Sequence, residues 1–313
     1  MGKRINYCFK YKVIFLFFLN FFLAISAQAQ KIEIVSKTFL ILPEDSKIKI
    51  KWMIVPSKEE LDNKKLQDNM QFCIDSRKKP IIAYDGKMLM NPITGSLIKI
   101  NKPFKKMVCN EDGAILFSDN ANLYYAEVDV STKSVLPEAT LKKIYEFPHI
   151  IADIYMGNES LFWVAYNESN RSYEVFLLNL ENKSFQKVVT FNEKISALTG
   201  DKNTIFLASG RKVWEFSDGK FRFYYEHPRE DIEELIYSQK TGLFYKTAHG
   251  IGCINNGHAI EFLQTEDSKV FLKEKSIFVF FAKRFGLIEL TDIDDLKRYN
   301  FKIDKIIDVK KNI

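Results

Sequence analysis

The sequence is poor in the residues from which most catalytic and metal sites are built. Its 313 residues include four cysteines and four histidines, and no histidine belongs to a recognisable metal-ligand motif. There is no Gly-x-Ser-x-Gly nucleophile turn, no phosphate-binding glycine loop and no calcium loop of alternating carboxylates. We therefore expect neither a metal site nor a cofactor, although a catalytic centre could still be assembled from residues far apart in the chain.

The cysteines do not form the pattern of a disulfide framework. Cys8 lies in the N-terminal segment, and the other three, Cys73, Cys109 and Cys253, are an odd number with wide spacing. We expect three buried thiols that act as small apolar side chains. The alternative is a bridge between Cys73 and Cys109, which lie at similar places in neighbouring repeats and would need Cα atoms within about 7 Å of each other.

The N-terminus has the features of a cleaved export signal. Four basic residues precede an uncharged, apolar run at residues 13–27, and Ala27 and Ala29 provide the small side chains that a signal peptidase requires. A spanning helix needs about 20 apolar residues, so an uncleaved anchor is the less favoured alternative. We predict a signal peptide at residues 1–29, cleaved after Ala29, and a periplasmic or secreted protein of bacterial type.

Cleavage would remove most of the net positive charge. The formal charge of +6 would fall to +2, because Lys3, Arg4, Lys10 and Lys12 would be lost and no acidic residue with them. The sequence therefore gives no electrostatic reason to expect nucleic acid as a partner. We also expect no membrane span after cleavage.

The mature chain shows a repeated order of short strands. Residues 195–198, 204–209, 212–216 and 220–225 are apolar or alternating segments separated by turn residues, including the hairpin signal Asp218-Gly219. The same order recurs at residues 151–190 and 231–263, and no linker divides the chain. The expected second strands contain Ile81, Ile115, Leu161, Ile205, Leu243 and Ile277.

These repeats indicate one all-β domain at residues 30–313. The spacings of 34 to 46 residues are too irregular for a solenoid and suit sheets arranged radially. Six units are visible. Residues 304–309 resemble a first strand with nothing after it, and residues 32–55 hold strands that lack a first strand. We therefore favour a seventh sheet closed by both termini over a ring of six. Residues 30–69 would provide these strands and a charged connector, and residues 70–313 the repeated units.

This arrangement resembles the β-propeller superfamily, with first strands such as residues 195–198 and second strands such as residues 205–208 in the usual order. The resemblance covers nearly all of the mature chain, but the sequence has no Trp-Asp, Gly-His, Kelch or quinoprotein signature, so it points to no subfamily. It implies that function resides at the mouth of a central channel, on the innermost strands and their flanking turns.

Polar residues on the expected first strands are therefore the candidate ligand-binding residues. They could hold a cation or a polar ligand if they converge; the alternative, which we favour, is that they cap turns. They are Asp75, Asn110, Asp153, Ser196, Asp231 and Glu233. Phe162, Phe206, Phe244 and Phe278 recur at one second-strand position, which favours packing between blades over ligand stacking.

Two classes of function fit the sequence. The first is a non-catalytic binding or scaffold protein that presents loops to a protein, peptide or glycan, a role that needs no special motif. The second is a channel-mouth hydrolase or lyase acting on a carbohydrate or peptide, which requires convergent carboxylates or histidines. The lack of motifs favours the first.

Overall fold

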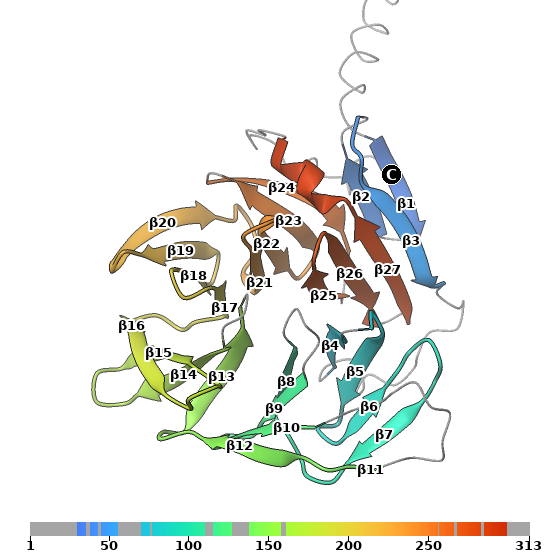
Figure 1. The fold of residues 1–313 in the computed structure, drawn as a ribbon. Helices are drawn as coiled ribbons and strands as arrows, with labels where there is room; N and C mark the ends of the chain where they lie inside the picture. The colour runs from blue at the N-terminus through green and yellow to red at the C-terminus, as the bar shows by residue number, and fades with distance from the viewer. Residues whose placement is uncertain are drawn as a thin grey trace, which may run out of the picture.

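The computed structural model describes residues 30–35, 38–42, 45–55, 70–75, 77–109, 115–126, 138–157, 161–255, 257–265, 268–282 and 285–298. Six sheets, almost entirely antiparallel, stand around a central axis, which confirms a β-propeller (Figure 1). The predicted signal peptide at residues 1–29, the charged connector at residues 58–66 and the expected strand at residues 304–309 lie outside the described residues. Within the described part of the chain, no helix has the length and apolar character needed to cross a membrane.

Each blade has four antiparallel strands that follow one another from the axis outward. Blade 1 consists of β4 (Gln71–Ile74), β5 (Pro80–Tyr84), β6 (Met88–Met90) and β7 (Leu97–Ile100). Blade 2 consists of β8 (Lys106–Cys109), β9 (Ile115–Ser118), β10 (Asn122–Tyr125) and β12 (Lys142–Glu146). Blade 3 consists of β13 (Ile151–Met156), β14 (Leu161–Asn167), β15 (Ser172–Leu178) and β16 (Phe185–Phe191). The short β11 (Glu138–Ala139) pairs in parallel with β7.

Blades 4 and 5 follow the same order. They are β17 (Ala197–Gly200), β18 (Thr204–Ser209), β19 (Lys212–Ser217) and β20 (Lys220–Glu226); and β21 (Ile232–Ser238), β22 (Gly242–Thr247), β23 (Gly250–Asn255) and β24 (His258–Gln264). The hairpin of β1 (Gln30–Val35) and β2 (Thr38–Leu42) adds to the outer edge of β24. It covers an edge that an unpaired strand would leave open to other chains.

Blade 6 closes the ring and corrects the expected blade count. It consists of β25 (Ser268–Lys273), β26 (Ser276–Phe281), β27 (Gly286–Thr291) and, as outermost strand, β3 (Lys49–Ile54), followed by the 3-10 helix η2 (Ile293–Arg298). The N-terminal strands therefore complete the sixth sheet and extend the fifth. The preference for seven blades was wrong because β3 supplies the fourth strand that the last repeat lacks.

Local turn chemistry sets the strand register. Asp218 and Gly219 have φ angles of 51° and 71° between the paired strands β19 and β20. Two consecutive positive φ angles are typical of the type I′ hairpin turn that an Asp-Gly pair favours, as predicted. Asp85 and Gly86, with φ angles of 53° and 61°, make a similar turn between β5 and β6.

The core lies between neighbouring blades, with one apolar cluster at each of the six interfaces. The recurrent second-strand phenylalanines, Phe162, Phe206, Phe244 and Phe278, are 0%, 5%, 1% and 0% exposed. Each belongs to the cluster shared with the next blade around the ring. The packing interpretation of these residues is confirmed.

A disulfide joins the innermost strands of blades 1 and 2. Cys73 on β4 and Cys109 on β8 are bonded, with Cα atoms 6.1 Å apart. The expectation of three buried thiols was wrong for this pair, because the ring brings equivalent positions of adjacent first strands side by side. Cys253 is free and buried, and burial raises the pKa of its thiol to about 12.

Candidate functional site

The innermost strands of all six blades line one central cavity of about 760 Å³. This size lies in the range of sites that take small ligands. Its wall combines apolar side chains, such as Met107, Ile154, Leu235 and Phe271, with charged ones. The cavity is therefore the candidate functional site.

The innermost strands run in the same direction along the cavity. Ser196, just before β17, donates its hydroxyl to the carbonyl of Ile232 at the start of β21 (2.8 Å). Further along, the Tyr237 amide donates to the Thr199 hydroxyl (3.1 Å). Equivalent ends of these strands therefore meet at the same end of the channel. We call the end where the innermost strands begin the N-terminal mouth, and the other the C-terminal mouth.

An ion pair links blades 2 and 3 at the N-terminal mouth. The Lys106 Nζ lies 2.9 Å from the Asp153 Oδ2 and 4.6 Å from the centre of the Tyr155 ring. Burial, followed by the neighbouring Asp153 carboxylate, raises the pKa of Tyr155 well above its ordinary value. Lys106 and Asp153 are each about one-third exposed (32% and 31%), so their pairing contributes to positioning more than to stability.

A second ion pair lies within blade 5. The Lys246 side chain on β22 is 4% exposed, and its ammonium donates to the Glu233 carboxylate on β21 and to the Thr247 carbonyl. A buried ammonium needs such partners because desolvation disfavours an isolated charge. A β-bulge at Glu233 places this residue between the paired positions Ile232 and Glu234, so that it can meet Lys246 at the rim of the cavity.

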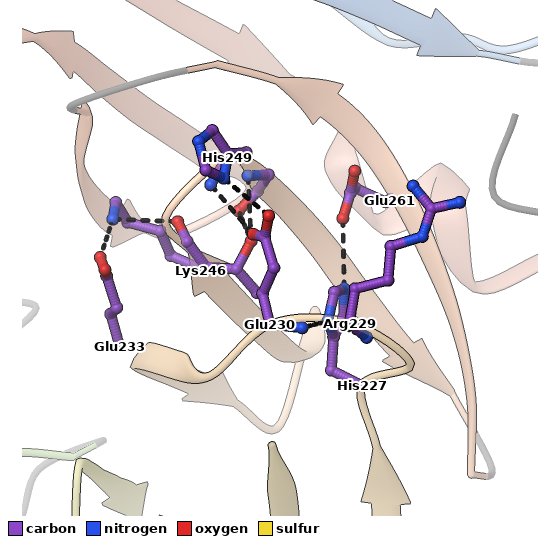
Figure 2. A network of polar contacts seen from close by, with 9 residues as sticks. His227, Arg229, Glu230, Glu233, Lys246, His249 and Glu261 are labelled. Atoms are coloured by element: carbon purple, nitrogen blue, oxygen red, sulfur yellow. Dashed lines mark hydrogen bonds and ion pairs between the residues drawn. The ribbon is translucent and has the colours of Figure 1, made fainter. Parts of the chain in front are cut away.

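Glu230 and His249 form a contact on the loops that flank these strands (Figure 2). The His249 Nδ1 lies 2.6 Å from one Glu230 carboxylate oxygen, and the His249 amide donates to the other (3.2 Å). Partial burial raises the pKa of Glu230. Hydrogen bonds from Thr247 and His249 and the charge of His249 outweigh that effect, and the pKa is lowered overall.

His227 is part of a buried polar network between blades 4 and 5 (Figure 2). Its Nδ1 accepts a hydrogen bond from the Glu230 amide (2.9 Å), which leaves Nε2 to donate toward Glu261 at 3.4 Å. A Cβ on Gly250 would lie 2.3 Å from the Glu261 carboxyl carbon, so a larger residue there would displace this carboxylate from its present position. The network fixes the two blades to each other and does not line the cavity.

The predicted ligand-binding residues lie in different surroundings in the structure, and only some of them are at the cavity. Ser196 and Glu233 line the cavity, and Asp153 pairs with the cavity residue Lys106. Asp75 accepts hydrogen bonds from the amides of residues 77 and 79, which is the turn-capping role weighed against ligand binding. Asp231 lies beside Gly210 and outside the cavity wall. Asn110 lies outside the described residues.

Sequence reasoning missed the basic side chains of the site. Lys105, Lys106 and Lys269 line the cavity, and Lys246 holds Glu233. Lys106 and Lys269 stand at the beginning of first strands, and Lys246 interrupts an otherwise buried strand. A charged residue inside an apolar strand is therefore a usable signal for such a site.

Among the described residues, no group of three or more His, Cys, Asp or Glu side chains is close enough to hold a metal ion. The carboxylates Asp153, Glu230 and Glu233 each pair with a different basic residue. This part of the chain thus presents a charged, partly apolar cavity.

No protein-family profile matches the sequence, and no curated protein matches it. Solved structures do resemble the fold. A luciferin-regenerating enzyme shares 11% identity over 76% of this chain and 95% of its own, with a TM-score of 0.53. A gluconolactonase of Xanthomonas campestris shares 9% over 76% and 97% (TM-score 0.49), and nidogen, solved in a complex with laminin, shares 11% over 63% and 73% (TM-score 0.39).

A shared propeller architecture does not by itself select one activity. At such identities the likeness concerns the fold. The chain is a six-bladed β-propeller whose ring is closed by its N-terminal strand β3.

Proposed function

We propose that this protein is an exported, non-catalytic binding protein that holds a peptide, glycan or protein segment at the N-terminal mouth of its channel. The observation that supports this is the cavity of about 760 Å³, walled by all six innermost strands and bearing both apolar and charged side chains. Sites of this kind bury a ligand against apolar surface and orient it with a few polar groups.

The pairing at the mouth favours binding over turnover. A general acid or base must reach the substrate in a suitable protonation state. The carboxylates of Asp153 and Glu233 are already engaged by Lys106 and Lys246, which fixes their orientation. Such fixed charges suit recognition of a ligand's polar groups.

The test is a binding assay on residues 30–313 with short peptides and oligosaccharides, followed by isothermal titration calorimetry and by chromatography of the ligand after incubation. We expect micromolar binding and an unchanged ligand. Lys105→Trp should abolish binding, because Lys105 is an exposed side chain on the cavity wall that a bulky ring would replace. Lys142→Trp, on the outermost strand of the same blade, should bind like the wild type.

Two results would contradict this function. If the ligand is cleaved, and Lys105→Trp stops the cleavage, the protein is a channel-mouth hydrolase or lyase. If Lys105→Trp binds as well as Lys142→Trp does, the ligand lies elsewhere on the ring. Export has its own test: the protein recovered from the periplasm or medium should begin at Gln30.

A further inference from the structure

The charges on the cavity wall are balanced in sign. Three lysines and three carboxylates line it: Lys105, Lys106, Lys269, Asp85, Glu233 and Glu234. Two of these six are neutralised by ion pairs with residues outside the wall. Lys106 pairs with Asp153, and Glu233 pairs with Lys246.

Glu234 and Lys269 are two opposite charges on the wall that have no partner within the described part of the chain. Both are partly buried on innermost strands, and neither forms an ion pair or hydrogen bond with its side chain within the described part of the chain. They lie on neighbouring blades, since β21 contacts β25, yet no ion pair joins them. A charge in a partly enclosed site loses water contacts and gains from a ligand of opposite charge.

Lys105 adds a second cation across the channel. The innermost strands contact one another in the order β4, β8, β13, β17, β21 and β25, which closes on β4. Blade 2, which carries Lys105, is therefore three positions away from blade 5, which carries Glu234. The Lys105 ammonium donates to the neutral carbonyl of Ala152 (3.2 Å), so its charge is not balanced there. Asp85, on the exposed turn after β5, adds a carboxylate at the rim.

We infer that the ligand of the channel is a zwitterionic oligopeptide with free termini, whose amino group binds Glu234 and whose carboxylate binds Lys269 or Lys105. This rests on the proposed binding function and selects one of its ligand classes. A neutral glycan would leave the opposite charges of the wall without partners. An anionic ligand would satisfy the lysines and be repelled by Glu234 and Asp85.

The apolar part of the wall suits the middle of such a ligand. Phe72 and Phe271, which line the cavity, are both partly buried, and Phe72 is stacked on Phe280 with ring centres 5.6 Å apart. Small apolar side chains of a peptide can pack against these rings while its termini reach the charges. Trialanine is therefore a suitable test ligand.

The experiment is calorimetry with trialanine, N-acetyl-trialanine, trialanine amide, the doubly capped peptide and maltotriose. We expect micromolar binding of the free peptide and a loss of about 10- to 100-fold for each cap, as for removal of a charge-assisted hydrogen bond. Glu234→Gln should weaken the free peptide as much as acetylation does, with no further loss on acetylation. Either Lys269→Gln or Lys105→Gln should weaken the free peptide as much as amidation does, with no further loss on amidation, because one of these lysines binds the carboxylate. If neither variant does so, the inference is overturned.

Matched variants test whether loss of any surface charge has this effect. Glu138→Gln and Lys142→Gln change exposed residues on the outer strands β11 and β12, and should bind trialanine like the wild type. Circular dichroism at the assay temperature checks that every variant is folded.

The outcomes separate this inference from the binding function. If maltotriose or the doubly capped peptide binds as well as trialanine, and Lys105→Trp abolishes that binding, the channel binds a ligand but the zwitterion inference is overturned. If acetylation weakens binding to Glu234→Gln as much as to the wild type, Glu234 does not hold the amino group and the inference is again overturned. If none of these ligands binds, neither proposal stands for short ligands.

Discussion

Blades 3 and 5 have the same strand order and the same bulge in the innermost strand, but they bury different side chains at one equivalent position. Val164 on β14 lies opposite Asp153 in the strand register, and Lys246 on β22 lies opposite Glu234. Both side chains are buried, with 2% and 4% exposure. One position of the repeat therefore holds an apolar residue in one blade and a cation in the other.

The difference shows how a structural repeat can carry a site. Val164 contributes to the apolar cluster between blades 3 and 4. Lys246 gives up that contribution and needs Glu233 and the Thr247 carbonyl to offset its desolvation. In return it fixes the Glu233 carboxylate at the channel mouth. At this position, blade 5 thus has a buried charge where blade 3 has apolar packing.

Val164→Lys should produce the largest effect, because it puts the lysine of blade 5 into blade 3 without its partner. The bulged residue opposite is Ala152, not a glutamate, and Asp153 already holds Lys106. We expect the free energy of unfolding to fall by about 3–5 kcal/mol, as for an uncompensated buried charge. Urea unfolding of the purified variant measures this.

A second substitution gives blade 3 the same two charged residues that blade 5 has. Adding Ala152→Glu to Val164→Lys recreates the pair of blade 5 and should restore at least half of the lost stability. Ala152→Glu alone is the control and should change stability little, since Ala152 is only partly buried. If the double variant is no more stable than Val164→Lys, the two bulges are not equivalent.

Glu233→Gln and Lys246→Met should lower the free energy of unfolding by different amounts, although both break the same ion pair. Glu233→Gln leaves a buried ammonium with a neutral partner, and we expect a loss of about 1–3 kcal/mol, moderated because Glu233 is 49% exposed. Lys246→Met removes the buried charge and leaves a carboxylate that water can reach, so we expect a change within about 1 kcal/mol. Chemical denaturation of both variants in one buffer measures these losses. Equal losses of stability would contradict the claim that the buried Lys246 charge depends on Glu233.

The general architecture was predictable from sequence because strand periodicity and turn residues are local. The strands of blades 3 to 5 were located to within a few residues, and the turn at Asp218-Gly219 was recognised from its two residues. The blade count was not predictable in this way. It depends on whether β3 pairs with β27, two strands far apart in the sequence, and no local pattern encodes that choice.

The site was predicted less well than the fold. Ser196 and Glu233 were named because polar residues on first strands face the channel, and both line the cavity. The partners were missed: Lys246 lies on a second strand, and Lys106 meets Asp153 across a blade interface. Contacts between blades depend on the ring closing at six. The bond between Cys73 and Cys109 was only the alternative to buried thiols, because the sequence does not show how close two adjacent first strands bring these positions.

The smallest expected effect concerns how the stability of the protein depends on pH through the Glu230 carboxylate of blade 5. The pKa of Glu230 is lowered in the folded protein, so its carboxylate stabilises the fold above the ordinary value of 4.5. That contribution is lost as the pH falls through the lowered pKa. Because Glu230 is partly exposed, we expect Glu230→Gln to cost less than about 1 kcal/mol at pH 7. The difference from the wild type should shrink between pH 4.5 and pH 3.

Blade 3 provides the control for this measurement. Glu168 is an exposed carboxylate on the turn after β14, and Glu168→Gln should follow the wild type at every pH. Unfolding in urea at pH 7, 5, 4 and 3 compares the three proteins. A Glu230→Gln deficit that persists unchanged at pH 3 would show that Glu230 acts through its shape and hydrogen bonds.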